Sequence, residues 1–129
     1  MEIKKIDIDF FRDLIHKAEG SERERTAYDL RNSSEDTSQR MLNALMPGTE
    51  VPIHMHEDTS ETCICMYGRL SVVFYDQLPN GKYKETERYN LDPSCGRYGI
   101  QIPQSAWHTV DVVFPSVIFE GKDGKYEPR

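Results

Sequence analysis

The feature that most constrains the fold of this chain is a change of sequence pattern near residue 40. From there onward, short runs with strand-like composition are separated by Pro and Gly. Closely spaced short strands of this kind are typical of an all-β barrel or jelly roll, in which closure protects the strand edges. About eight strands are therefore predicted, over residues 40–46, 51–56, 61–67, 69–76, 82–90, 97–102, 107–114 and 116–121.

Residues 1–39 have a different pattern. Over residues 7–19 the apolar side chains recur at helical spacing, with Asp7 or Asp9 as N-cap and Gly20 as the stop, so one amphipathic helix is predicted. Residues 21–39 are polar and of mixed charge, which indicates a loop or covering arm. The expected organisation is an N-terminal helix and arm over 1–39 and a barrel over 40–129, together one structural domain.

Charge and composition exclude several classes of protein. The chain has 16 Lys and Arg against 22 Asp and Glu, a net charge of −6, which disfavours nucleic acid and anionic membranes as partners. No apolar run approaches the ~20 residues of a membrane helix, and no signal peptide begins the chain, so a cytoplasmic location is expected. Three cysteines, an odd number, do not indicate a disulfide framework. Hydrophobic residues make up only 37% of the chain. The hydrophobic core is therefore expected to be thin, or to be supplemented by other stabilising interactions.

Three of the four histidines form a pattern with one carboxylate. His54 and His56 are two residues apart, and such residues share one face of a strand. Glu61 follows after a polar segment that can turn, and His108 follows a turn that begins at Pro103. A lone His is more often a surface or core residue, but three imidazoles and one carboxylate suit a divalent transition metal. We expect these four residues to bind one metal ion: Fe, Mn, Zn, Ni or Co.

The spacing of these residues resembles the two-part motif of the cupins. The first part is complete, with Gly48, His54, His56, Glu61 and Gly68 at the family's intervals, and the second contains Pro103 and His108. The second part departs from the family where Arg97, Ser105 and Val112 stand in place of two Gly and one Asn. The resemblance implies a double-stranded β-helix, a jelly-roll barrel, that encloses the metal.

Nearly the whole chain is similar to the small cupin-fold metalloproteins of the WbuC type. The similarity is carried by residues 39–48, by 102–110 around Trp107 and His108, and by the closing segments 119–121 and 126–128. Such proteins occur in bacterial surface-polysaccharide, or O-antigen, gene clusters. The resemblance therefore implies a role in polysaccharide biosynthesis, with a sugar or sugar phosphate as the small-molecule substrate. Cupins also commonly dimerise, so a homodimer is expected.

Several polar residues are candidates for substrate binding. Arg23, Arg25 and Arg40 carry guanidinium groups that can bind a phosphate or carboxylate through two hydrogen bonds. Asn43 has the opposite strand parity to Arg40, so only one of the two is expected to face the pocket, and Arg40 is favoured. Tyr126 is a candidate because it lies in the C-terminal segment shared with the resembled family. Most charged residues in such an arm face water, which is the competing interpretation for each arginine.

The sequence leaves three hypotheses for the function. The first is an enzyme whose metal polarises a sugar carbonyl or hydroxyl for isomerisation or epimerisation. The second is a metal-dependent dioxygenase, and the third is a non-catalytic protein in which the metal orients a bound sugar or metabolite. Cys63 and Cys65 share the parity of Glu61 and are expected to point inward, as small apolar residues or as thiols near the metal.

Overall fold

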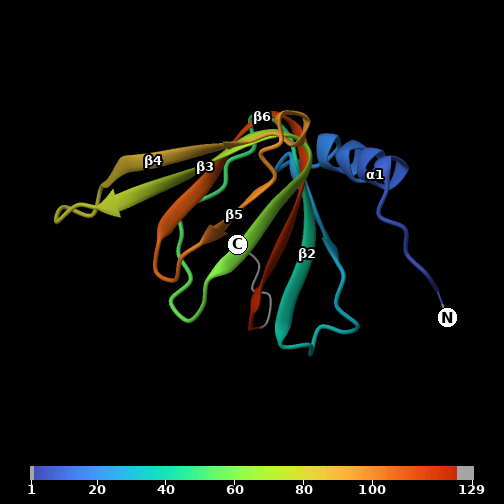
Figure 1. Cartoon of the computed structure of the whole chain (residues 1–129), viewed down its shortest axis with the longest axis horizontal. Helices are drawn as coiled ribbons and strands as arrows, with labels where there is room; N and C mark the ends of the chain where they lie inside the picture. Colours follow the sequence, from blue (N-terminus) through green and yellow to red (C-terminus); the bar gives the residue numbers. More distant parts are fainter. Residues whose placement is uncertain (1, 125–129) are drawn as a thin grey trace.

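The computed structural model describes residues 2–124 and contains one α-helix, one short 3-10 helix and six strands (Figure 1). Their bounds are α1 Ile8–Glu19, β1 Arg25–Asp29, β2 Ser38–Leu45, β3 Glu61–Gln77, β4 Tyr83–Leu91, η1 Pro93–Cys95, β5 Gly99–Ile102 and β6 Trp107–Asp123. Within the described range, the structure contains no helix of sufficient length and apolarity to cross a membrane.

All strand pairs are antiparallel, in the order β1-β2-β6-β3-β4, with β5 also paired to β3. β3 and β6 are both 17 residues long and pair with each other along most of their length, with register irregularities between Cys65 and Leu70. Before the irregular segment, β3 lies between β5 and β6; after it, β3 lies between β6 and β4. The two long strands thus bend from one sheet layer into a second, and the predicted all-β jelly roll is confirmed.

The number of strands differs from the prediction at three places. Residues 61–67 and 69–76 are one continuous strand bent at Gly68, and 107–114 and 116–121 are one strand that passes through Pro115. Residues 51–56 form no strand, and only His54 makes an isolated bridge, to His108. The bent strands keep their ladder partners across the bend, so Gly68 and Pro115 change the direction of the chain without ending the pairing.

The prediction of a loop or arm over residues 21–39 is wrong for its middle part. Arg25–Asp29 form β1, which pairs with β2 from Arg25↔Leu45 to Asp29↔Met41. The ring of Tyr28 packs edge-on against Phe10 of α1 at 5.0 Å between centroids. This strand therefore depends on contacts with α1 and β2, which its own polar sequence does not reveal. The predicted helix is confirmed, with Asp7 as N-cap accepting a hydrogen bond from Phe10 N.

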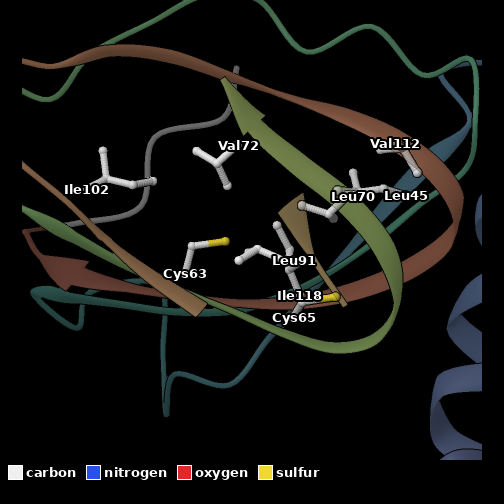
Figure 2. Packing of buried hydrophobic residues seen from close by; sticks show 9 residues of the cluster. All are labelled: Leu45, Cys63, Cys65, Leu70, Val72, Leu91, Ile102, Val112 and Ile118. Carbon is white, nitrogen blue, oxygen red and sulfur yellow. The ribbon is translucent and has the colours of Figure 1, made fainter. Parts of the chain in front are cut away.

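The core has two parts, on opposite sides of the layer that contains β2. Inside the roll, nine buried residues pack together from both sheet layers (Figure 2): Leu45, Cys63, Cys65, Leu70, Val72, Leu91, Ile102, Val112 and Ile118. Outside it, α1 packs Phe11, Leu14 and Ala18 against Leu42, Ala44 and Val117. In Figure 1, α1 lies at one side of the sheets and the β3–β4 hairpin extends at the other. The helix thus covers the outer face of β2 and leaves the inner face to the roll.

Candidate metal centre

Three imidazoles meet at one end of the roll. His54, His56 and His108 each place one ring nitrogen within 4.8 Å of the others, an arrangement that could hold a metal ion. The backbone positions two of them directly, because His54 N donates to His108 O at 3.0 Å and His108 N donates to His54 O at 2.8 Å. The spacing in the sequence therefore did bring the three predicted histidines together.

Hydrogen bonds to the backbone select the nitrogen that faces the centre. Nδ1 of His54 lies 2.8 Å from Pro52 O, and Nδ1 of His108 lies 2.8 Å from Ala106 O. A carbonyl oxygen can only accept, so each Nδ1 must carry the proton and donate. In a neutral imidazole the lone pair then resides on Nε2, the atom available to ligate a metal. Metal-bound histidines in proteins are usually oriented by the same kind of partner.

The fourth predicted ligand lies against the triad. Glu61 Oε2 is 3.0 Å from His56 Nε2, and both atoms are buried without a well-formed hydrogen bond. Two atoms that bind one metal at about 2.1 Å and at right angles lie about 3.0 Å apart, so the contact has the spacing of neighbouring ligands. Buried polar atoms without a well-formed hydrogen bond are costly in a protein that binds nothing there. The residues present thus fit a divalent transition metal.

The Glu61 carboxylate has the charge that such a site requires. Burial of Glu61 acts to raise its pKa, but the adjoining His56 imidazole and the neighbouring Glu120 and His108 side chains outweigh burial and lower the pKa below its usual value. A carboxylate with a lowered pKa is ionised at neutral pH and offers lone pairs to a cation.

Two loops hold the two halves of the motif together. Ser105, at the turn before β6, has a left-handed backbone with φ 64°. Its N–H donates to His56 O at 2.8 Å, and the Gln104 side chain donates to Glu57 O. The turn that precedes His108 is therefore fastened to the loop that carries His56. Ser105 replaces a glycine of the cupin pattern, and the structure shows that it still adopts the positive φ.

A cavity of about 130 Å³ opens beside these ligands and contains several of the predicted substrate residues. Arg23, Arg25 and Asn43 line it together with His54, Glu61 and His108. Arg40, the favoured candidate, is directed elsewhere: its guanidinium donates to Ser38 Oγ and Asp36 Oδ2, and it is not part of the cavity wall. The opposite parity of Arg40 and Asn43 was correctly predicted, but Asn43 is the residue that faces the cavity. Tyr126 lies outside the described residues.

Glu120 is a cavity residue that the sequence reasoning missed. It is 5% exposed, lines the cavity beside Glu61, and accepts a hydrogen bond of 2.6 Å from Asn43 Nδ2. The available signal was a carboxylate two residues from Ile118 in a strand, which places both side chains on the inward face. A larger hollow of about 1380 Å³ lies elsewhere, along β4 and the end of β3, and none of the four histidines lines it.

Cys63 and Cys65 are both 1% exposed, as their shared parity with Glu61 predicts. Burial is the main cause that raises the pKa of both thiols, and that of Cys65 rises to about 11. Both side chains are therefore neutral thiols at physiological pH, and they pack as small apolar residues in the roll (Figure 2).

This burial predicts a difference in thiol reactivity. All three cysteines are free, but only Cys95 is exposed. We expect Ellman's reagent to react rapidly with about one thiol in the native protein and with all three after denaturation, because the thiolate must be formed and accessible. Cys95→Ser is expected to abolish the rapid phase. Rapid reaction of either remaining thiol in that variant would contradict the burial of Cys63 and Cys65.

The bent double-layer sheet with a histidine cluster at one end defines the cupin fold. A cupin-2 domain containing protein from Shewanella frigidimarina NCIMB 400 aligns with a TM-score of 0.56 at 19% identity, over 76% of this chain and 79% of that chain. CapF, a capsular polysaccharide assembling protein from Staphylococcus aureus, aligns with a TM-score of 0.63 at 16% identity, over 84% of this chain and 30% of CapF. Oxalate decarboxylase from Bacillus subtilis, which contains Mn(II) centres, aligns with a TM-score of 0.56 at 18% identity, over 81% of this chain and 26% of that protein.

Within this fold, the chain belongs to the family DUF6016, described as a domain of unknown function, whose profile matches residues 6–88. The matched range includes α1, β1, β2 and three of the four candidate ligands, and ends before His108. No sequence among the curated proteins matches the chain.

Proposed function

We propose that this protein is a metal-dependent cupin in which His54, His56, Glu61 and His108 bind one divalent transition metal. The observation that carries the proposal is the state of the donor atoms. Two imidazoles have Nδ1 bonded to backbone carbonyls, and a buried carboxylate lies 3.0 Å from the third imidazole. Three nitrogen donors and one oxygen donor suit Fe, Mn, Zn, Ni or Co, and the Mn(II) centres of oxalate decarboxylase support this assignment.

The metal, when bound, supplies Lewis-acid polarisation of a carbonyl or hydroxyl oxygen of the substrate. Residues of the chain orient the substrate and exclude water. Asn43 Nδ2 and Glu120 Oε1 form a polar pair on the cavity wall at 2.6 Å and orient the substrate's hydroxyl or carbonyl groups. Leu45, Ile102 and Ile118 contribute apolar parts of the same wall and limit access of water. The site therefore combines metal ligands, polar contacts and an apolar enclosure.

We propose isomerase or epimerase chemistry on a sugar-derived small molecule as the reaction class. The similarity to WbuC-type proteins and the likeness to CapF, a capsular polysaccharide assembling protein, support a role in surface-polysaccharide biosynthesis. Oxygen uptake that depends on Fe(II) and on substrate would instead indicate a dioxygenase. Ligand binding without turnover under any metal would indicate a non-catalytic binding protein.

Metal content tests the proposed site. We expect purified protein, incubated with Co(II) and dialysed, to retain about one ion per chain, and His56→Ala to retain less than a tenth of that, because one of four ligands is lost. His16→Ala is the matched control, since His16 is exposed on α1, and it should bind as the wild type does. Elemental analysis measures the content, and circular dichroism confirms folding. Equal metal in the wild type and His56→Ala would refute the assignment.

A further inference from the structure

Arg25 presents a guanidinium to the metal-site cavity with no carboxylate partner among the described residues. It begins β1, is half-buried, and lines the cavity with Glu61 and His108. Its one described hydrogen bond is from Nη1 to Glu50 O, at 2.5 Å. A guanidinium has five N–H donors in a fixed fork, so donors remain for a ligand. Hydrogen bonds between Arg and a carboxylate are strong and frequently bidentate, so this guanidinium suits a bound carboxylate.

The backbone on each side of this arginine is held in place. Glu24, its neighbour, has φ 56°, a left-handed conformation that non-glycine residues rarely adopt and that often marks functional sites. The loop after β2 fixes this turn, since Met46 N donates to Glu24 O at 3.0 Å and Thr49 Oγ1 donates to Arg23 O at 2.7 Å. The position of Arg25 relative to the histidines is thus set by the fold.

The volume of the cavity limits what can be enclosed between Arg25 and the histidines. It measures about 130 Å³, and a protein cavity of roughly 150 Å³ accommodates one benzene molecule. The enclosed part of the ligand therefore has about six non-hydrogen atoms. A pyranose ring with its hydroxyls is about twice that size and would be enclosed only in part, whereas the 2-hydroxy acid end of a sugar acid, for which lactate is the minimal probe, fits.

We propose that Arg25 is the carboxylate subsite of this cavity and that the enclosed part of the ligand is the 2-hydroxy or 2-oxo acid end of a sugar-derived acid. The carboxylate lies on the guanidinium, and the oxygen on the neighbouring carbon points toward His54 and His108. This assignment rests on the proposed metal site, because that oxygen is the group the metal would polarise. Together with a bound divalent cation, the Arg25 guanidinium would also offset the negative charges of Glu61 and Glu120, which would otherwise repel an anion.

Calorimetric titration of the Co(II)-loaded protein with lactate and with lactamide, its neutral analogue of the same shape, tests the subsite. We expect lactate to bind at least about tenfold more tightly than lactamide, and Arg25→Gln to reduce lactate affinity at least about tenfold while lactamide affinity is unchanged. Arg25→Lys should recover part of the loss, because the charge remains without the fork. The matched control is Arg12→Gln, since Arg12 is exposed on α1, and it should bind lactate as the wild type does.

Two outcomes would overturn the subsite. They are equal binding of lactate and lactamide, and wild-type lactate affinity in Arg25→Gln. Co(II) content is measured in the same samples, and the visible Co(II) spectrum reports whether lactate reaches the metal. Equal binding of lactate and lactamide by wild-type protein with normal Co(II) content refutes only the role of Arg25. Absence of Co(II) from the wild type refutes the metal site itself.

Discussion

Removal of the metal is expected to lower the melting temperature of this protein by roughly 10 °C. A ligand present at about 100 times its dissociation constant stabilises the native state by about 2.7 kcal/mol, and each kcal/mol shifts the melting temperature of a domain of this size by a few degrees. The physical reason is that the ligands come from separate segments: His54 and His56 from a loop, Glu61 from β3 and His108 from β6. A bound ion cross-links these segments.

The measurement is differential scanning calorimetry of metal-loaded protein before and after addition of EDTA and again after Zn(II) is restored. His56→Ala is the internal reference, because EDTA should leave its melting temperature unchanged. His16→Ala should respond as the wild type does. Equal melting temperatures of the wild type with and without EDTA, at a confirmed change in metal content, would show that the core alone maintains the fold.

This prediction follows from the low apolar content of the chain, 37%. The inward faces of β3 and β6 give positions to Glu61, His108 and Glu120 that an ordinary jelly roll would fill with apolar side chains. Each of these polar residues serves the candidate site, but it also reduces the apolar area that folding buries and so weakens the hydrophobic contribution to stability. Stability and function would therefore depend on the same cavity, with the proposed metal contributing to both.

The positions of strands could be predicted from the runs between Pro and Gly, but the merging of neighbouring runs could not. A strand that bends at Gly68 and continues its ladder has the same local sequence as two strands joined by a turn. Only the pairing of β3 with β6 on both sides of the bend distinguishes them. β1 was missed for a related reason, because Tyr28 packs on α1 and the strand pairs with β2, and neither contact is local.

In the candidate site, the residues predicted best were those constrained by spacing. His54 and His56 share a loop, and the structure joins His108 to His54 by an isolated bridge. The cavity wall was harder to predict, because strand parity restricts Arg40 and Asn43 to opposite faces but does not say which face is inward. The ion pair of Arg40 with Asp36 settles the choice in favour of Asn43. Strand parity placed Glu120 on the same face as Ile118, but only the fold shows that this face lines the cavity with Glu61.

The second large effect is expected at Gly68, where β3 bends between the two sheet layers. Gly68 has φ +92°, and a Cβ there would overlap the Pro115 carbonyl oxygen and lie 2.7 Å from Ser116 Cα. Both contacts involve the β6 backbone, which cannot move without breaking the ladder that β3 and β6 share. Gly68→Ala is therefore expected to destabilise the protein by about 3 kcal/mol or more, the sum of a strained φ and a backbone overlap.

Gly81→Ala separates the two causes, because Gly81 has a similar φ of +83° in the β3–β4 turn, but a Cβ added there would meet no heavy atom within 4 Å. We expect about 1 kcal/mol for that variant from backbone strain alone, and chemical denaturation of both variants measures the difference. If Gly68→Ala destabilises the protein no more than Gly81→Ala does, then the β6 backbone moves at Pro115 to make room and close packing does not hold the bend. If the larger loss is observed, the glycine of the motif is required because two strand backbones approach each other there, and the bend that brings Glu61 and His108 to one cavity depends on that approach.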